Sequence, residues 1–586
     1  MLDKLEKIVA DAKAAAEAVK TFPGEIRVVS HYDADGITSA AIITRALQRE
    51  GKSFHVTLLK QLGDERLKEI SPYKKDRMFI FSDFGSGMLT AINNHLRCAP
   101  IIILDHHQPE VMELALPNMI EINPVKVGIN DNIAASGVAY IFARAMDPQN
   151  RDMAHLAVIG AIGDSQMGAI GPKWGLMGLN AEIVKDAQEM KKIRVGRGMR
   201  LWGRYTRPIH KALEYSMNPY IPGVSGSESG SVQLLQEAGI DLKRPDGSWK
   251  TMADLTEKEQ QRIADKIIME RIRHDQPNPD WIFGDIYELL EGKEDMRDAN
   301  ELATMLNATG KTESGYIGIM LCLGRTEAHE AVKDLMEKYK RTLSKASAWI
   351  REHPEAVMKT KHADYIMAGD NISEHAISSM VSILNNSMDN TKPMFGLVDA
   401  EEGTKVSARA SDRLVRAGLN LKELVAAAVK ETGGQGGGHS GAAGATIPKG
   451  AEKKFIELME KALERIDLSV SEPGIPEVVE KCENNIKDLN QNVSNQESGT
   501  PAVPDKKDVL DVRRKEAGQE TGRKEEVDKE RWGNRSGEAG PAERTQATGV
   551  AGKEGSNGKK VEGQGLVRYL EPKGLRREVH FRNACD

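Results

Sequence analysis

The chain has 586 residues, of which 40% are hydrophobic and 29% charged, and its formal net charge is −6 at pH 7. This length exceeds what one hydrophobic core usually organises, so we expect two or three domains. The first twenty residues mix acids, lysines and alanines, which predicts an amphipathic helix and argues against a signal peptide. No apolar run approaches the ~20 residues of a membrane span, and the four cysteines form no CxxC pair. We therefore expect a cytoplasmic protein with no membrane partner, no disulfide framework and no cysteine zinc site.

The first 165 or so residues alternate short apolar runs with helical patterns. The expected strands are Ile26–Ser30, Phe54–Leu59, Met78–Ser82, Ile101–Leu104 and Met119–Ile122, and the expected helices include Ile37–Glu50, Met88–Leu96 and Ile133–Ala145. Alternation of this kind predicts a parallel sheet covered by helices on both faces. Ligands of such sheets bind beyond the carboxyl ends of the strands.

The middle of the chain contains a basic stretch between Lys191 and Leu213 that carries no acid. Trp202 and Tyr205 are interleaved with its cations, which are Lys191, Lys192, Arg194, Arg197, Arg200, Arg204, Arg207 and Lys211. Cations for phosphates and aromatic rings for bases are typical of single-strand binding, so Arg197, Arg200 and Arg204 are candidate nucleic-acid contacts. A solvated basic connector would give the same pattern. Further along, the charged run Glu327–Glu352 predicts a long helix that bridges to the next domain.

Residues from about 358 to 468 again mix strands and helices. The expected elements are Ala363–Ala368, Met394–Asp399, Lys405–Ala410 and Leu419–Lys430, followed by the glycine-rich GGQGGGHSGAAGATIP. Between Ser471 and Gly565 the composition turns to Gly, Glu, Lys, Asn and Ser, which predicts disorder. The last twenty residues regain apolar side chains among arginines, so either a short docking motif or a tail without function fits them.

Four groups of Asp and His stand where the predicted strands, or an apolar helix, end. They are His31, Asp33 and Asp35 in HYDADG, Asp83 in FSDFGSG, Asp105, His106 and His107 in LDHHQP, and Asp164 in GAIGDSQ. Any one of them alone could be a helix cap or a turn residue. Four such groups at successive strand ends point instead to cations, because hard divalent ions prefer carboxylates and imidazole shifts the preference toward Mn²⁺. A pair of metals ~3.5–4 Å apart needs roughly this many groups, so the count fits a dinuclear site for phosphoryl transfer.

The glycine-rich segment of the second domain has its own chemistry. Gly437 and Gly438 let a backbone approach a phosphate closely, and His439 can add a further donor. Ser407 and Arg409, on the preceding predicted strand, could bind the same phosphate. A flexible glycine linker is the alternative, although the small and β-branched residues that follow the glycines indicate packing.

HYDADG, FSDFG, LDHHQP and GAIGDSQ resemble, in this order, the four motifs of DHH phosphoesterases, and GGGHSGAAG resembles the DHH-associated domain of RecJ nucleases. The segments RDANELATMLNATG and LCLGR are further similar to archaeal RecJ-like proteins. The resemblance implies that Asp33 and Asp83, often with His31, bind one metal. It implies that Asp35, Asp83, His106 and Asp164 bind the other, so that Asp83 bridges. Asp105 would orient an imidazole, and His107 would face the scissile phosphate.

These observations together predict an α/β protein in four parts. They are an N-terminal parallel-sheet DHH domain (1–195), a helical insertion with a bridging helix (196–357), a smaller C-terminal α/β DHH-associated domain (358–468) and a disordered tail (469–586). The expected function is a two-metal exonuclease, using Mn²⁺ or Mg²⁺, that degrades single-stranded DNA or RNA from an end in replication or repair. The archaeal resemblance also implies a link to the GINS complex.

Three other functions stay open at this point. One is a DHH phosphodiesterase for oligoribonucleotides or cyclic dinucleotides, although the basic stretch and the large middle region favour a longer substrate. Another is a non-enzymatic replication scaffold, as in the eukaryotic helicase-associated relative of RecJ, although the metal motifs of this chain are intact. The third is the pyrophosphatase branch of the superfamily, which lacks the glycine-histidine signature.

Overall fold

The computed structural model describes residues 2–466 apart from gaps at 74–75, 112–117, 130–132, 171–172, 217–218, 275, 277–278 and 388–390, together with 565–570 and 576–581. The segment Ser471–Gly565, for which disorder is predicted, therefore lies outside the described residues except for its last residue. Among the described helices, none combines the length and the apolar character that crossing a membrane requires.

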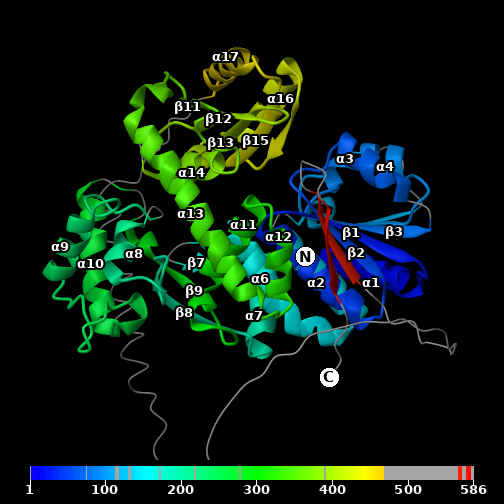
Figure 1. Cartoon of the computed structure of the whole chain (residues 1–586), viewed down its shortest axis with the longest axis horizontal. Coiled ribbons are helices and arrows are strands. Elements are labelled where there is room, and N and C mark those ends of the chain that lie inside the picture. The colour runs from blue at the N-terminus through cyan, green and yellow to red at the C-terminus, as the bar shows by residue number, and fades with distance from the viewer. Residues whose placement is uncertain are drawn as a thin grey trace, which may run out of the picture. The chain divides into compact units, whose positions relative to one another are not determined.

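A parallel sheet organises the N-terminal domain (Figure 1). Its strands are β1 (Glu25–His31), β2 (Phe54–Leu59), β3 (Arg77–Ser82), β4 (Ile101–Leu104) and β5 (Met119–Ile122), close to the predicted bounds. They run parallel in the order β2-β1-β3-β4-β5. The helices of this domain are α1 (Leu2–Thr21), α2 (Ala34–Arg49), α3 (Asp64–Ile70), α4 (Leu89–Leu96), α5 (Ala135–Met146) and α6 (Ala154–Gly163).

Both faces of this sheet are buried under helices. Successive side chains of a strand point to opposite sides, so one strand contributes to two cores. In β3, Met78 and Ile80 join a core with α1, α2 and α5, whereas Phe79 and Phe81 join a second core with α3 and α4. The predicted arrangement, a sheet covered by helices on both faces, is confirmed. Consequently the carboxyl ends of β1, β3 and β4 are held rigidly side by side, and the Asp and His motifs follow them.

The sheet also gains two strands from the end of the chain. Strand β16 (Gly565–Leu570) pairs in parallel with β2, and β17 (Arg576–Phe581) pairs antiparallel with β16. These strands lie within the segment predicted as a disordered tail, and they bring the sheet to seven strands. From the sequence alone, the apolar residues near the end of the chain fit either a docking motif or a tail without function. In the structure, Leu566 to Tyr569 pair with β2 of the N-terminal domain.

The middle of the chain contains small sheets and helices. Its elements are β6 (Gly168–Ile170), β7 (Lys173–Gly175), α7 (Gly178–Glu189), β8 (Ile193–Met199), α8 (Ile209–Glu214), α9 (Glu228–Glu237), α10 (Glu257–Arg273), β9 (Phe283–Leu289), α11 (Ala299–Lys311), α12 (Gly315–Cys322) and the 25-residue α13 (Ala328–Glu352). Strands β8 and β9 pair antiparallel. Helices α11 and α12, which fall in the predicted insertion, contribute Leu306 and Ile319 to the core of the N-terminal domain.

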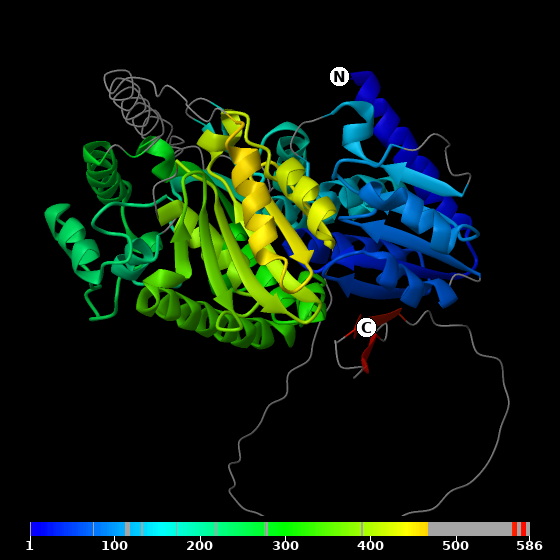
Figure 2. The ribbon, with the colours of Figure 1, turned by 90° about the horizontal axis from the view of Figure 1, so that it is seen from above.

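The second domain is a mixed sheet with helices on both faces (Figure 2). Its elements are β10 (Val357–Lys359), β11 (Asp364–Gly369), α14 (Ile377–Ser387), β12 (Met394–Ala400), β13 (Gly403–Arg409), α15 (Asp412–Arg416), α16 (Leu421–Thr432), β14 (Gln435–Gly438), β15 (Ala442–Ile447) and α17 (Glu452–Leu463). The strand order is β10-β11-β12-β13-β15-β14. The glycine-rich segment is therefore the paired hairpin β14–β15 and not a flexible linker.

Helix α11 is joined to the start of the insertion by a buried acid. Glu301, 2% exposed, accepts hydrogen bonds from the N–H groups of Gly203 (2.9 Å) and Arg204 (2.8 Å) and from the Thr206 hydroxyl (3.3 Å). Burial, together with the nearby Asp298, raises the pKa of Glu301 to about 7. The loop 203–206 and α11 are thus held together by one side chain that titrates near neutrality.

This raised pKa predicts a pH-dependent stability. Between the ordinary glutamate pKa of 4.5 and about 7, the folded protein keeps a proton on Glu301 that the unfolded chain has lost. The free energy of unfolding should therefore fall as pH rises through this window, by at most about 3 kcal/mol. Glu301→Gln, which keeps an acceptor and cannot ionise, should raise Tm relative to the wild type at pH 7.5 and change it little at pH 5. The exposed Glu257→Gln serves as the control; equal effects of Glu301→Gln at both pH values would contradict the prediction.

Candidate metal centre

The first motif forms the turn between β1 and α2. Asp33 caps α2, and its Oδ1 accepts the N–H of Gly36 (3.0 Å). Gly36 is required here because a Cβ would lie 2.2 Å from the His31 carbonyl oxygen. His31 Nδ1 lies 3.0 Å from Asp33 Oδ2 and 3.3 Å from Asp83 Oδ2. The turn therefore brings one imidazole and two carboxylates from β1 and β3 together.

Asp35 lies in the first turn of α2 and is 1% exposed. Its two oxygens accept the N–H groups of Ala135 (2.8 Å) and Ser136 (3.0 Å), at the N-terminus of α5. Unpaired N–H groups and the helix dipole stabilise a negative charge at such a position. The carboxylate of Asp35 is thereby fixed, with Oδ2 3.9 Å from Nε2 of His106.

Asp83 follows β3 in the left-handed backbone region, with φ at +62°. A non-glycine residue rarely adopts this conformation, and such strain concentrates at functional sites. The conformation turns the carboxylate so that its two oxygens face different imidazoles. Oδ2 lies near His31, whereas Oδ1 lies 3.5 Å from Nε2 of His106. Asp83 thus stands between two groups of side chains.

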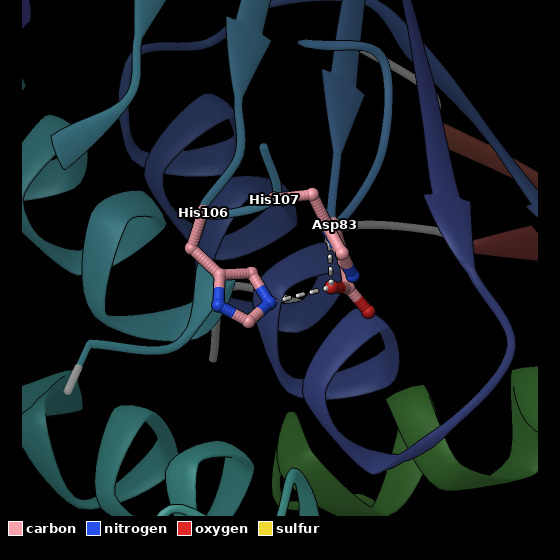
Figure 3. Close-up of side chains that lie close together, drawn as sticks. All are labelled: Asp83, His106 and His107. Carbon is pink, nitrogen blue, oxygen red and sulfur yellow. Dashed lines mark ion pairs between the residues drawn. The ribbon is translucent and has the colours of Figure 1, made fainter. Parts of the chain in front are cut away.

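The third motif places a fully buried aspartate directly before two imidazoles, of which His106 is 7% and His107 33% exposed. Asp105 is fully buried and accepts the N–H groups of Ser86 (2.9 Å), His106 (2.8 Å) and His107 (3.1 Å). Its Oδ1 also accepts from His107 Nδ1 at 2.7 Å. Asp105 therefore contacts the imidazole of His107, and its role in orienting a catalytic imidazole stays a prediction. Figure 3 shows His106 and Asp83 pointing toward each other.

Asp164 ends α6 and completes the set. Its Oδ2 lies 3.7 Å from His106 Nε2, so that this ring nitrogen faces the carboxylates of Asp35, Asp83 and Asp164. The Nε2 atom is buried and has no hydrogen-bond partner among the described residues. Ligand atoms that share one cation, each ~2.0–2.2 Å from it, lie about 3–4 Å apart, which is the spacing found here. The residues present therefore fit a divalent ion.

The side chains form overlapping groups whose ligand atoms lie within 4.8 Å of one another. They are His31/Asp33/Asp83, Asp35/His106/Asp164 and Asp83/His106/His107. All six predicted metal ligands, and His107, are thus brought together by the fold. Because Asp83 belongs to two groups, the arrangement suits two ions that share one carboxylate.

The pKa values reflect the crowding of negative charge. Burial, and then Asp83 and Asp164, raise the pKa of Asp35 well above its ordinary range. Burial likewise raises the pKa of Asp164 to about 6. Burial alone would lower the pKa of His106, but Asp164 and its other acidic neighbours raise it to about 10. Asp35 and Asp164 thus resist ionisation while His106 retains its proton, and a cation bound among them would stabilise the ionised carboxylates.

The second domain places His439 beside this cluster. The His439 ring stacks near His107, with centroids 5.1 Å apart, and lies 5.9 Å from His106. Burial, and then the two imidazoles, lower the pKa of His439 to about 4, so it is neutral at pH 7. Gly438, at φ +138°, could not carry a Cβ because one would lie 2.4 Å from the Ala442 carbonyl oxygen. The predicted glycine–histidine segment therefore meets the Asp/His cluster.

Ser407 and Arg409 lie on β13, which pairs with β15 of the glycine-rich hairpin. Ser407 is 3% exposed and faces Gly444 in the register of the two strands. The Arg409 guanidinium donates from Nε to the Ser382 hydroxyl (2.9 Å), and burial lowers its pKa. Gly437, on β14, has open space where a Cβ would stand. A ligand could approach the backbone at this glycine.

The basic stretch has partners in the middle of the chain. Arg200 stacks on Trp174, with Cζ 3.8 Å from the ring centroid, and donates to the Trp281 carbonyl oxygen (2.8 Å). Arg194 forms an ion pair with Glu288. The N–H of Arg204 bonds to Glu301, and Arg197 lies on the exposed part of β8. Much of the positive charge is thus used in folding, and a nucleic-acid role for Arg197, Arg200 and Arg204 stays a prediction.

Three residues near the cluster were not predicted from the sequence. Asn307 of α11 accepts the N–H of Ala34 (2.9 Å), which fixes the turn between the predicted metal ligands Asp33 and Asp35. Gly310 lets α11 approach this turn, since a Cβ would lie 1.8 Å from the Tyr32 carbonyl oxygen. Gln166 donates to Asp164 Oδ2 (2.8 Å). Asn307 and Gly310 lie in the LNATG segment, which was noted for its resemblance without a role being assigned.

Comparison with known families matches three domain models to the chain. Residues 25–161 match the DHH family N-terminal domain, residues 201–281 the DHH-CID domain, and residues 360–465 the DHHA1 domain. The DHH match contains the strands that carry most of the cluster, and the DHHA1 match contains the glycine-rich hairpin. The DHH-CID match coincides with the part of the insertion between β8 and β9.

An uncharacterised protein of Methanocaldococcus jannaschii is 32% identical over 468 residues, which cover 79% of this chain and 99% of the relative. The single-stranded-DNA-specific exonuclease RecJ of Thermus thermophilus is 26% identical over 243 residues, 38% of this chain and only 34% of that protein.

Two solved structures share the fold. RecJ of Thermus thermophilus in complex with Mn²⁺ has a TM-score of 0.50 at 18% identity, covering 82% of this chain and 59% of that one. CDC45 from Entamoeba histolytica has a TM-score of 0.55 at 10% identity, covering 78% and 99%. The domain matches, the relatives and the Asp/His cluster agree: the chain belongs to the DHH superfamily of phosphoesterases and is RecJ-like.

Proposed function

We propose that this protein is a metal-dependent exonuclease that removes nucleotides from an end of single-stranded DNA or RNA, in DNA replication or repair within the cytoplasm. The observation that carries the proposal is the Asp83 carboxylate, which stands between two groups of metal-ligating side chains next to His439 of the second domain. A dinuclear site suits phosphodiester hydrolysis, since two cations can stabilise both the attacking and the leaving oxygen. RecJ, which shares the fold and part of the sequence, supports the nucleic-acid substrate.

In this proposal His31, Asp33 and Asp83 hold one Mn²⁺ or Mg²⁺ ion, and Asp35, Asp83, His106 and Asp164 hold the other. When bound, the ions would polarise the phosphate and lower the pKa of a water molecule. The side chains of the protein would orient the imidazole of His107 and keep it positively charged. The pKa of Asp105 is lowered to about 2, first by His107 against the effect of burial, so Asp105 stays an anion and keeps the His107 pKa raised. Because the Nδ1–H group of His107 donates to Asp105, its Nε2–H group would face the scissile phosphate as a positively charged hydrogen-bond donor.

A cluster of cations near β13 suits the phosphates of the strand. Lys405 of β13 has its pKa lowered to about 8 by burial and by Lys60, with Lys311 and Arg409 adding to the effect. Lys60 pairs with Glu374 (2.7 Å), and Lys405 donates to the Glu374 carbonyl oxygen (2.9 Å). Lys311 donates to the hydroxyl of Ser379 (2.7 Å). The charges of Lys60, Lys311 and Arg409 all act on Lys405, and a phosphate would balance this positive charge. We therefore place the strand against Ser407, Arg409, Gly437, Gly438 and these lysines.

A scaffold role is the second candidate. The DHH-CID match and the structural likeness to CDC45 favour it, and an association with the GINS complex would fit both roles. The two functions are compatible, because the Asp/His cluster and the insertion occupy different segments of the chain. A pull-down with GINS tests the association, and the assay below tests the activity.

Loss of the shared carboxylate should abolish activity. The full chain is incubated with Mn²⁺ and four end-labelled 20-mers: single-stranded DNA and RNA, each labelled at either end. We expect stepwise release of mononucleotides that stops with EDTA, and a loss of at least about 10³-fold in Asp83→Ala/Asp164→Ala, because the ions lose their shared ligand. The exposed Asp241→Ala serves as the control and should retain the wild-type rate. Normal turnover by the double variant would refute the metal site; a wild type inactive in both Mn²⁺ and Mg²⁺ would favour the scaffold.

Removing one half-buried cation, Lys405, should weaken strand binding. Lys405→Met keeps the length of the side chain but removes its charge, so the affinity for a single-stranded 20-mer should fall roughly tenfold at low salt. The slope of log Kd against log salt concentration should become smaller by about 0.7, since one counterion contact is lost. Fluorescence anisotropy in Ca²⁺ or EDTA measures this without cleavage. Lys430→Met, an exposed lysine of the same domain, is the matched control; an unchanged slope in Lys405→Met would place the strand elsewhere.

A further inference from the structure

Helix α6 ends in a motif that brings the side chains of Asp164 and Gln166 together at the Asp/His cluster. Ser165 is left-handed, with φ at +58°, and its N–H bonds to the Ile162 carbonyl oxygen (3.0 Å). The Gln166 N–H bonds to the Ala161 carbonyl oxygen (3.0 Å), which completes a Schellman motif. This motif reverses the chain directly after Asp164, so the Gln166 side chain folds back over the carboxylate.

The Gln166 carboxamide touches both a carboxylate and an imidazole of one metal group. Its Nε2 donates to Asp164 Oδ2 at 2.8 Å and lies 3.4 Å from His106 Nδ1. Oδ2 is the Asp164 oxygen that faces His106 Nε2, and Nδ1 is the ring nitrogen on the other side of the imidazole. One amide thus contacts two of the three side chains of the Asp35/His106/Asp164 group.

Gln166 is itself held from α7. Asn180, 2% exposed, donates from Nδ2 to Gln166 Oε1 at 2.7 Å. Fixing the oxygen of the amide also fixes the direction of its N–H groups, since the carboxamide is planar. A chain of hydrogen bonds therefore runs from α7 through Gln166 to the metal group, and its outer member does not belong to any of the candidate metal groups.

The chemistry explains why a neutral amide suits this position. The carboxylates of Asp35, Asp83 and Asp164 already repel one another, so a further acid next to Asp164 would add to the repulsion. A lysine or arginine would compete with a metal ion for the same oxygens. An amide donates to the carboxylate without adding charge, and partners of metal ligands that orient them in this way commonly raise metal affinity.

We propose that Gln166, held by Asn180, is a positioning residue that sets the affinity of the Asp35/His106/Asp164 group for Mn²⁺. The inference rests on the metal site of the proposed function but not on the substrate or on the direction of cleavage. Gln166 acts through Asp164 and His106, and Asn180 acts through Gln166. The two amides should therefore behave as one unit when they are substituted.

Isothermal titration of the metal-stripped full chain with Mn²⁺ tests the proposal. We expect Gln166→Met to weaken binding at one of the two sites roughly 10–100-fold, as loss of such partners does elsewhere. Asn180→Ala should weaken binding at the same site by less, because Gln166 keeps its own bond to Asp164. The double variant should match Gln166→Met, since Asn180 has no effect once Gln166 is gone.

Asn150→Ala is the matched control. Asn150 is as buried as Asn180, and it donates to the Ala143 carbonyl oxygen (2.8 Å) and accepts from Arg49 (2.8 Å). Its loss should lower Tm and leave the Mn²⁺ affinity unchanged, which separates positioning from general destabilisation.

Wild-type Mn²⁺ affinity in folded Gln166→Met would overturn the proposal, and additive losses in the double variant would overturn the role of Asn180. A wild type that binds Mn²⁺ but cleaves no strand would end the proposed nuclease function while leaving this inference in place. A wild type that binds no Mn²⁺ would end both.

Discussion

The architecture depends on holding several negative charges close together in a site that is largely shielded from water. Burying one carboxylate is costly, and Asp35, Asp83 and Asp164 stand around a single imidazole nitrogen. The fold meets part of this cost with backbone donors: two N–H groups at the start of α5 hold Asp35, and three N–H groups hold Asp105. These donors are available only because the strand ends and the helix start meet at one edge of a rigid sheet. The remaining cost is what a bound cation would offset.

Helix α11 connects this site to the rest of the molecule. At its N-terminal end Glu301 holds the loop 203–206, and near its C-terminal end Asn307 holds the turn that carries Asp33 and Asp35. Lys311, its last residue, bonds to Ser379 of α14 in the second domain. One helix therefore contacts three parts of the chain: the segment that matches DHH-CID, the turn between β1 and α2, and the DHHA1 domain.

The fold could be predicted where the signal is local. The five strands of the N-terminal sheet are short apolar runs, and the Asp and His motifs follow three of them directly. The structure brings together every residue that the sequence suggested as a metal ligand, because parallel strands end at the same edge.

The rest could not be predicted, because it depends on contacts between distant segments. Asn307 lies 273 residues from its partner Ala34, and Glu301 lies 97 residues from Arg204. The partners of the basic stretch are also distant in the sequence. Its cations have no acid among them in the sequence, whereas in the structure Arg194 pairs with Glu288 because β8 and β9 lie side by side. The strands β16 and β17 likewise become visible only through their pairing with β2.

The length of α13 has a consequence for how this family can change by insertion and deletion. This helix of 25 residues leads from the insertion to the second domain, whose His439 must arrive beside His107. Each residue of a helix adds about 1.5 Å of length and about 100° of rotation. Loss of a single residue would therefore turn the glycine-rich hairpin away from the cluster, although every side chain of both domains stayed intact. The number of residues in α13 therefore sets both the distance and the rotation at which His439 reaches the candidate metal groups.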